Sequence, residues 1–335
     1  MNSEHQGGTM KVGIAGNGTI IPTFIDGARE AGIEIACICG RPASIEKLNA
    51  LAERFSIPKV YTDYEEMLSS EIDAVYVGVS NYMHYDYSKK ALEHKKHVIC
   101  EKPFTSNYAQ AEVLYNICKE NHLYLFEAIM NQYNPSLEEI KKAVKEIGEI
   151  RIAELSFSQY SRRYQAFKNG EILPVFDPQK AGGALMDINL YNVYMMVGIF
   201  GAPLKVTYHA NIVKDIDTSG VLVMEYPGFK ASLIGAKDCS APMRFSIHGD
   251  LGYIESDQRP SAVNRFKVQM NDGSGYEYEA KEHHQNMFHE MSAFRRMLET
   301  DAFDEMMAHL GDSLTVMKIM DEARNQNGIL TDFPA

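Results

Sequence analysis

The sequence predicts an α/β protein: a doubly wound parallel sheet, followed by a second, α+β domain built on a large, mostly antiparallel sheet. In residues 10–131, short apolar runs alternate with segments of helical spacing, the pattern of a parallel sheet whose strands are joined by helices. The first apolar run leads directly into a glycine-rich turn. In residues 132–335, strand-like segments dominate. We therefore expect two domains, 10–131 and 132–335.

Length and composition fit this division. At 335 residues the chain is too long for one ordinary core. Its 45% hydrophobic and 23% charged residues are typical of a soluble globular protein, and no apolar run approaches the roughly 18 residues that span a bilayer. Residues 1–9 are polar and lack the apolar segment of a signal peptide, so we expect a disordered leader there.

Charge and cysteine content restrict the partners and the compartment. A net charge of −12 disfavours nucleic acid, which binds to clustered Lys and Arg. It does not exclude a phosphate-bearing cofactor, because local donors bind phosphate on an acidic protein. The five cysteines are an odd number, lie mostly in apolar segments and form no CxxC pair, which indicates reduced, buried thiols in a cytoplasmic protein.

The stretch MKVGIAG (residues 10–16) predicts a buried strand that ends in a glycine-rich turn. In Rossmann sheets the backbone amides of such a turn, with the amino terminus of the next helix, bind the pyrophosphate of a dinucleotide. Gly16 and Gly18 match that fingerprint, whereas Ile21 replaces its third glycine. A strand, turn and helix without a ligand would explain the stretch about as well. The candidate cofactor contacts here are Gly16, Asn17, Gly18, Thr19 and Ile20.

The end of the second predicted strand, 33–39, bears on the choice of cofactor. A NAD site usually has an acidic residue there, which binds the ribose 2′-hydroxyl. This chain has Arg41 instead, and no carboxylate before Glu46. Because a guanidinium pairs with a 2′-phosphate or stacks on adenine, we expect NADP, with NAD as the alternative. An ordinary surface arginine is the other interpretation of Arg41.

The following segments continue the alternation. Residues 72–79 are nearly all apolar, as in a parallel strand buried on both faces, and Ser80 after them is a good helix cap. Because the carboxyl ends of parallel strands meet at one edge of the sheet, we expect Gly16, Arg41, Ser80 and Lys102 to lie there. The other predicted elements are helix 43–55, strand 57–61, helix 64–69, helix 85–94 and strand 97–100.

The stretch VICEKPF (residues 98–104) places a carboxylate, an ammonium and a proline at the end of a buried strand. Ligands of an open α/β sheet bind at this end of its strands. Lys102 is therefore our first candidate for a catalytic residue. A solvated loop lysine is the alternative when the tripeptide is taken alone.

The second half contains a charged helix, 136–147, and then strand-like segments, several of which alternate polar with apolar residues, as in a sheet with one buried face. An apolar helix from Ala181 to about Phe200 carries Asp187 and Tyr191, four residues apart, so both lie on one helix face and can reach one substrate. A buried aspartate beside a core tyrosine would explain this pair equally well. The predicted strands are 150–159, 206–213, 220–226, 229–236, 243–248, 253–256 and 265–270.

Two other features do not indicate a site. His283, His284 and His289 form no HExxH motif and have no convincing Cys or carboxylate partners, so we predict no metal and interpret them as a solvated helix end. The methionines, 18 in all, most simply fill the core.

Several motifs, in their order along nearly the whole chain, resemble one family. They are GIAGNG, Ser80-Asn81 followed by His84, HVICEKP, Glu127-Ala128 to Pro135, GGALMDINLY (182–191), and an amphipathic helix at 286–298. The chain resembles the glucose-fructose oxidoreductase, inositol dehydrogenase and rhizopine-catabolism (Gfo/Idh/MocA) family. Many members carry His where Tyr191 stands, and the tyrosine resembles the dihydrodiol dehydrogenase and glucose-fructose oxidoreductase branches. The resemblance implies cofactor contacts at Ser80, Asn81, His84, Glu101 and Lys102, and a homo-oligomer, dimer or tetramer, formed through the open sheet face.

The resemblance also implies an NADP(H)- or NAD(H)-dependent oxidoreductase that transfers hydride between nicotinamide and a secondary alcohol or ketone of a sugar, polyol or cyclic diol. Lys102 and Tyr191 would exchange the proton near neutral pH, since an ammonium lowers the pKa of a tyrosine and burial lowers that of a lysine. Asp187 would orient the substrate, and Glu101 the nicotinamide ribose. Gln132, where relatives often have Arg, makes an acidic substrate less expected.

Two other functions remain open. One is a nicotinamide-using glycosidase of the same family, which oxidises its substrate transiently and recycles the cofactor. The other is a non-enzymatic regulator that binds NADP and a partner protein. The joint presence of Lys102, Asp187 and Tyr191 speaks against the regulator, because a sensor has no need of a proton relay.

Overall fold

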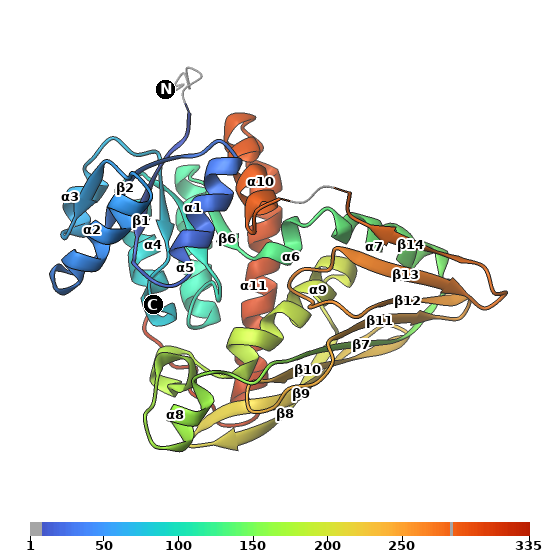
Figure 1. Ribbon diagram of the computed structural model, residues 1–335. Helices are drawn as coiled ribbons and strands as arrows, with labels where there is room; N and C mark the ends of the chain where they lie inside the picture. The colour runs from blue at the N-terminus through green and yellow to red at the C-terminus, as the bar shows by residue number, and fades with distance from the viewer. Residues whose placement is uncertain (1–8, 282–283) are drawn as a thin grey trace.

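The computed structural model describes residues 9–281 and 284–335, so His283 and all but the last residue of the predicted leader lie outside the described residues. The first layer is a six-stranded sheet with the order β3-β2-β1-β4-β5-β6 (Figure 1). Every neighbouring pair in it is parallel, which confirms the predicted doubly wound sheet. Its strands are β1 (Lys11–Ala15), β2 (Glu34–Cys39), β3 (Lys59–Tyr61), β4 (Ala74–Val77), β5 (His97–Glu101) and β6 (Leu125–Ala128).

Helices connect these strands, as the alternating pattern predicts. They are α1 (Ile21–Glu30), α2 (Ile45–Arg54), α3 (Tyr64–Leu68), α4 (His84–Glu93) and α5 (Tyr108–Asn121). The strand order reverses between β1 and β4. In open α/β sheets, ligands bind beside the carboxyl ends of the strands at such a reversal. Gly16, Arg41, Ser80 and Lys102 follow the ends of β1, β2, β4 and β5.

The second layer is an eight-stranded sheet with the order β14-β13-β12-β11-β7-β10-β9-β8. Only β7 and β10, among its described neighbours, pair in parallel, so the sheet is mostly antiparallel, as predicted. The strand at β14 is an addition that the sequence pattern did not indicate. The strands are β7 (Ile150–Ser158), β8 (Lys205–Val213), β9 (Ile216–Tyr226), β10 (Phe229–Ala236), β11 (Arg244–Gly249), β12 (Gly252–Ser256), β13 (Arg265–Met270) and β14 (Gly275–Glu279).

Helices of the second half cover one face of this sheet and also join it to the first (Figure 1). The carboxyl-terminal helix α11 (Phe303–Asn325), which the sequence did not predict, packs on α5 and β6 of the first layer and on β8 of the second. The other helices here are α6 (Met130–Tyr133), α7 (Ser136–Glu146), α8 (Tyr164–Lys168), α9 (Leu190–Phe200) and α10 (Phe288–Glu299). None of the described helices is long and apolar enough to cross a membrane.

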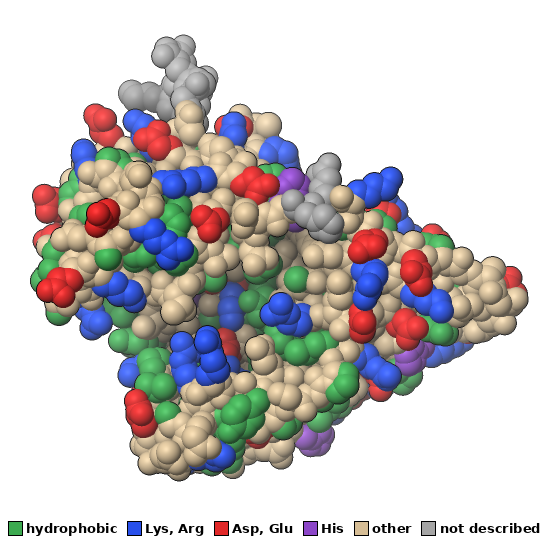
Figure 2. Space-filling model, viewed as in Figure 1, with side chains coloured by type: hydrophobic (Ala, Val, Ile, Leu, Met, Phe, Trp, Pro, Cys, Tyr) green, Lys and Arg blue, Asp and Glu red, His purple; other side chains and the backbone are tan. Residues whose placement is uncertain are grey.

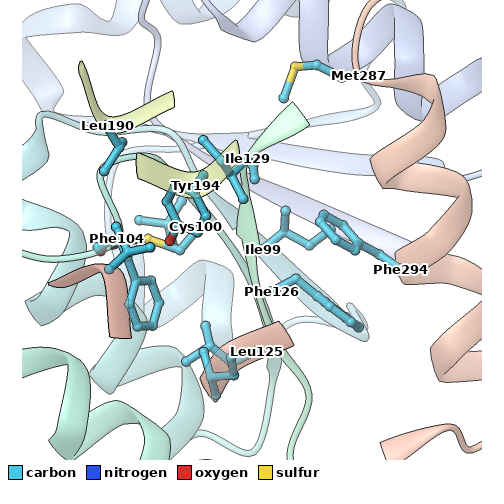
Figure 3. Close-up of a cluster of buried hydrophobic side chains, with 14 of the residues drawn as sticks. Ile99, Cys100, Phe104, Leu125, Phe126, Ile129, Leu190, Tyr194, Met287 and Phe294 are labelled. Carbon is cyan, nitrogen blue, oxygen red and sulfur yellow. Dashed lines mark hydrogen bonds between the residues drawn. The ribbon is translucent and has the colours of Figure 1, made fainter. Parts of the chain in front are cut away.

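One apolar cluster fixes β5 relative to α9 (Figure 3). Ile99 of β5 and Phe126 of β6 are buried with Leu190 and Tyr194 of α9 and Phe294 of α10. The rings of Phe126 and Phe294 stack with their centroids 4.4 Å apart. Because this cluster lies directly behind the end of β5 and the start of α9, it determines where the residues that follow these ends are placed.

The cysteines follow the prediction with one exception. Cys37, Cys39, Cys100 and Cys118 are buried free thiols. Cys239 is exposed, so the expectation of a buried thiol was wrong there. It lies just beyond the end of β10, where the chain has already left the sheet.

Three buried glutamates lie near one another where α10 meets the first sheet. Tyr76 donates a hydrogen bond of 2.6 Å to Glu101, and Tyr194 donates one to Glu127. Glu290 is 1% exposed, and neither of its carboxylate oxygens has a hydrogen-bond partner among the described residues. Burial raises the pKa of Glu290 well above its usual range, and the carboxylates of Glu101 and Glu127 raise it further. Burial therefore favours the protonated form of the Glu290 carboxyl in the folded protein.

We expect Glu290→Gln to stabilise the protein more at pH 8 than at pH 5. A raised folded-state pKa means that the wild type loses stability as pH rises from the unfolded pKa of the glutamate toward the folded one, by about 1.4 kcal/mol per pH unit. Glutamine has no such loss. Denaturant unfolding of both proteins at the two pH values measures the difference, with exposed Glu277→Gln as the control. A difference that does not change with pH would contradict the burial argument.

Candidate active site

A cavity of about 330 Å³ is formed by the end of β5, the start of α9 and the ends of β7 and β10. Figure 2 shows Lys and Arg side chains gathered around the hollow between the first sheet with its helices and the second sheet. The cavity is lined by residues from both halves of the chain: Lys102, Phe157, Gln159, Tyr160, Ser161, Arg162, Arg163, Asp187, Ile188, Tyr191 and Lys237.

The three predicted catalytic residues meet in this cavity. Lys102 follows β5 directly, and its peptide bond to Pro103 is cis. Its ammonium Nζ lies 2.9 Å from Oδ1 and 3.0 Å from the backbone oxygen of Asp187. The same Nζ lies 5.1 Å from the centroid of the Tyr191 ring. The fold thus brings together a lysine and an aspartate that are 85 residues apart in sequence.

Asp187 does not lie in a regular α-helix, as the sequence analysis assumed, but in a π-helical turn, Leu185–Asn189, that opens into α9. Asp217 holds this turn, because its Oδ2 accepts a hydrogen bond of 2.6 Å from the amide of Leu185. Gly183 has a φ of 110°, and a Cβ there would lie 2.1 Å from Oδ1 of Asp217, so the preceding loop requires glycine. Turns of this kind occur frequently at functional sites.

Lys237 is a site residue that the sequence analysis missed. It is the first residue after β10, and its ammonium forms an ion pair with Oδ2 of Asp187. Its side chain is 8% exposed, against 19% for Lys102. One carboxylate therefore lies between two ammonium groups. The signal in the sequence was weak: a lysine directly after an apolar strand, with no motif around it.

The ion pairs decide the protonation states. Burial alone would raise the pKa of Asp187, but the ammonium groups of Lys102 and Lys237 hold that pKa well below its usual range. Burial alone would lower the pKa of Lys102, but Asp187 and Tyr191 raise it above the usual value. Burial raises the pKa of Tyr191, more than Lys102 lowers it. The predicted shifts of Lys102 and Tyr191 toward neutrality were therefore wrong: the lysine is charged and the tyrosine neutral.

A second cavity, of about 200 Å³, lies at the ends of β1, β2 and β4. Of the predicted cofactor contacts, Gly16, Asn17, Gly18, Arg41 and Ser80 line it. The other lining residues are Cys39, Gly40, Ser44, Gly78, Val79, Tyr82, Met83 and Tyr87.

The glycine-rich turn in this cavity suits a phosphate-bearing ligand. Gly16 has a φ of 122°, and a Cβ there would lie 2.4 Å from the backbone oxygen of Gly78, so only glycine fits between the two strand ends. The amide of Gly16 donates to Cys39, whereas those of Asn17 and Gly18 form no hydrogen bond with other described residues. Free amides at the start of a helix are donors for phosphate oxygens. The residues present therefore fit a dinucleotide.

The remaining predicted cofactor contacts lie outside this cavity. Thr19 is exposed in the turn, Ile20 is the residue before α1, and Asn81 begins a short 3-10 turn. Glu101 is buried and bonded to Tyr76. Lys102, also a predicted cofactor contact, lines the other cavity, and the cofactor contacts of all these residues stay predictions.

His84 is buried against the turn that follows Lys102. It is 1% exposed, and its Nδ1 lies 2.8 Å from the backbone oxygen of Pro103. Burial lowers the pKa of His84 to about 4, so the ring is neutral and donates this hydrogen bond. His84 therefore supports the turn after Lys102, and its predicted contact with a cofactor stays a prediction.

Gln132 also differs from its prediction. It is buried, donates a hydrogen bond of 2.8 Å from Nε2 to the backbone oxygen of Tyr194, and does not line the Lys102 cavity. Its charge, or the lack of one, therefore has no direct bearing on the substrate. The expectation that an acidic substrate is disfavoured loses its basis.

His284 and His289, near α10, are half-buried. His284 Nδ1 lies 2.7 Å from Oε1 of Glu30, and its ring stacks on Phe288 with centroids 3.9 Å apart. The predicted solvated helix end is therefore half-buried at His284 and paired with Glu30. Among the described residues, no group of three or more His, Cys, Asp or Glu side chains is placed to hold a metal ion.

Sequence comparison matches both halves of the chain to one family. Residues 10–129 match the GFO/IDH/MocA oxidoreductase family with an NAD-binding Rossmann fold, and residues 137–255 match the GFO/IDH/MocA C-terminal domain. The chain is 31% identical over 331 residues to scyllo-inositol 2-dehydrogenase (NADP(+)) of Bacillus subtilis (strain 168), covering 97% of this chain and 99% of the relative. This chain belongs to the GFO/IDH/MocA oxidoreductase family.

Other proteins are similar to this GFO/IDH/MocA member over most of their length. Trans-1,2-dihydrobenzene-1,2-diol dehydrogenase of Xenopus tropicalis is 27% identical, with 88% of this chain and 90% of the relative covered. A 3-ketoreductase from Actinomadura kijaniata, solved with NADP and TDP-benzene, has a TM-score of 0.81 at 22% identity, and the match covers 95% of this chain and 98% of the other. The solved structure supports the two-sheet fold of this GFO/IDH/MocA member.

Proposed function

We propose that this chain is an NADP-dependent dehydrogenase or reductase that interconverts a secondary alcohol and a ketone on a sugar, cyclitol or cyclic diol. The observation that carries the proposal is the meeting of Lys102, Asp187 and Tyr191 in one cavity. That cavity lies at the same edge of the first sheet as the glycine-lined one. The Bacillus relative is named for scyllo-inositol and the Xenopus relative for a cyclic diol, which supports this substrate range.

The glycine-lined cavity would hold the cofactor. The amides of Asn17 and Gly18 and the start of α1 suit the pyrophosphate. Arg41 is the charged residue among those lining this cavity, which includes no described Asp or Glu, so the site suits a 2′-phosphate. When bound, the nicotinamide supplies or accepts the hydride.

The residues of the larger cavity would handle the proton. Lys102 is charged and Tyr191 neutral, so each holds a proton that it can donate to a ketone oxygen as that oxygen gains negative charge. Asp187, which stays ionised between two ammonium groups, can accept a hydrogen bond from a neighbouring hydroxyl and orient the ring. In the oxidative direction, Tyr191 or Lys102 must first be deprotonated. Neither the glycosidase nor the regulator is favoured by a specific feature of this site.

The test is direct. Purified protein is titrated with NADPH and NADH by nicotinamide fluorescence, and then screened with alcohols and ketones of sugars, cyclitols and diols by absorbance at the nicotinamide band. We expect tighter binding of NADPH and turnover with at least one member of these classes. Binding of the cofactor without turnover of any of them would favour the regulator. Release of a nitrophenol from a nitrophenyl glycoside without net change of cofactor would favour the glycosidase.

Arg41→Ala is expected to weaken binding of NADPH about 10- to 100-fold and to leave binding of NADH nearly unchanged. A hydrogen-bonded ion pair with a phosphate contributes about 1.5–3 kcal/mol, and only NADPH has the 2′-phosphate. The two dissociation constants measure the effect, with Arg54→Ala on the neighbouring α2 as the control. Equal weakening of both cofactors would remove the basis for the NADP preference.

We also propose that the protein is cytoplasmic and self-associates through the open face of the second sheet. Ile152 of β7 and Ile234 of β10 are 42% and 39% exposed and point away from the buried face. Sedimentation of the wild type and of a variant with charged residues at these two positions tests the assembly.

A further inference from the structure

The cavity around Lys102 is basic, although the protein as a whole is acidic. The chain carries a net charge of −12. Among the described residues that line the cavity, one carboxylate, Asp187, faces four cationic side chains: Lys102, Arg162, Arg163 and Lys237. A local surplus of positive charge in an acidic protein attracts and binds anions.

At the inner end of the cavity the positive charge is only partly balanced. Asp187 is the carboxylate partner of both Lys102 and Lys237. Both oxygens of its carboxylate are engaged, one by each ammonium. One positive charge therefore remains uncompensated, and the 8% exposure of the Lys237 side chain keeps bulk water from screening it fully.

At the mouth of the cavity two adjacent arginines lie on a segment that is held by the backbone of the β10 end. The amide of Gln159 donates to the backbone oxygen of Ala236 at 2.9 Å, and that of Ser161 donates to the backbone oxygen of Lys237 at 2.8 Å. Arg162 and Arg163 follow directly, just before α8. Neither guanidinium forms an ion pair with another described residue, although both line the cavity.

These arginines are not needed for the cofactor site described above. The glycine-lined cavity shares no described lining residue with the Lys102 cavity, and Arg41 supplies its positive charge. The surplus charge at Arg162 and Arg163 is thus available to the other ligand of the enzyme, its substrate.

We propose that the substrate carries a carboxylate or a phosphate group in addition to the alcohol or ketone that reacts, and that Arg162 and Arg163 bind this anionic group. The proposal rests on the function proposed above, because it assigns the substrate class of the same cavity. A guanidinium donates two parallel hydrogen bonds to a carboxylate or a phosphate, which a neutral sugar cannot accept as strongly. An anionic substrate is the opposite of what the sequence analysis expected from Gln132.

Binding, rather than turnover, tests the proposal. Protein saturated with NADP is titrated calorimetrically with three matched probes: glucose, glucuronate and glucose 6-phosphate. We expect at least one charged sugar to bind about 10- to 100-fold more tightly than glucose, as one or two charge-assisted hydrogen bonds predict. In the variant Arg162→Ala/Arg163→Ala this ratio falls toward one. Lys168→Ala, which removes one positive charge on α8 outside the cavity, leaves the ratio unchanged.

The outcomes separate this proposal from the proposed function. Three results would overturn the proposal of an anionic substrate. The protein could bind glucose and both charged sugars equally, it could bind none of the three, or its preference for a charged sugar could survive the double substitution. The glucuronate and phosphate titrations identify which anion is preferred. Failure of the nicotinamide screen with a preserved, arginine-dependent preference would instead remove the redox function and leave the anion site standing.

Discussion

Lys102→Met is expected to lower kcat about 1,000-fold while the protein stays folded. Proton transfer by a positioned side chain contributes about 10²–10⁴ to a rate. We propose that Lys102, whose ammonium lies 5.1 Å from the centroid of the Tyr191 ring, takes part in this transfer. Methionine keeps the length of the side chain and removes its charge. Asp187 keeps Lys237 as its partner, so the loss of stability remains modest. The measurement is nicotinamide absorbance under saturating substrate and cofactor.

The control for this variant is Lys119→Met, an exposed substitution on α5 that lies outside both cavities. Its kcat is expected to match the wild type, and circular dichroism of both variants checks the fold. A Lys102→Met protein that binds NADPH and retains most of its kcat would show that the proton moves elsewhere, and Tyr191→Phe would then be the next variant to measure.

The sequence was a good guide wherever a residue's position is determined by its own strand. Gly16 and Lys102 each follow a buried parallel strand, and parallel strands have a common carboxyl edge, so their placement follows from local pattern alone. The pairing of Asp187 with Tyr191 was found from their spacing, although the turn between them is π-helical. In both cases the information lies within a few residues of the side chain concerned.

Lys237, Gln132 and α11 could not be placed in this way. Lys237 reaches Asp187 only because β10 lies beside β9 and near the π-helical turn, a contact between segments 50 residues apart. Gln132 gave a wrong inference because its amide turns toward Tyr194, into the core. Helix α11 is packed against both sheets, so its apolar residues occupy several faces and no single stripe marks it.

The protonation states of Lys102 and Tyr191 also depend on residues that are distant in the sequence. Lysine beside tyrosine predicts a shared proton near neutral pH, but a second ammonium and a carboxylate change the balance. Asp187 stabilises the charge on Lys102, and burial keeps Tyr191 neutral. A sequence that shows only Lys102 and Tyr191 does not show that Asp187 and Lys237 lie beside them. The direction in which the pKa of Lys102 shifts depends on such neighbours from distant segments.

Asp187→Asn is expected to lower the free energy of unfolding by about 3 kcal/mol and to reduce kcat as well. Removing the carboxylate leaves the ammonium groups of Lys102 and Lys237 facing each other with little water between them, and an unpaired buried charge of this kind costs about 3–5 kcal/mol. The access of water to the cavity places this site at the low end of that range. Urea denaturation at pH 7 measures the effect. The exposed pair Lys230–Glu225 is the control, and Glu225→Gln is expected to cost less than about 1 kcal/mol.

A second substitution separates charge from packing. In the Asp187→Asn background, Lys237→Met removes one of the two ammonium groups, so it should recover at least half of the lost stability, since the repulsion between them is gone. It should not restore kcat, because the carboxylate that we propose to orient the substrate hydroxyl is still absent. If the double variant is no more stable than Asp187→Asn alone, the destabilisation comes from the altered π-helical turn. In that case the ion pairs of Asp187 with Lys102 and Lys237 are not what stabilises the contact between the two halves of the site.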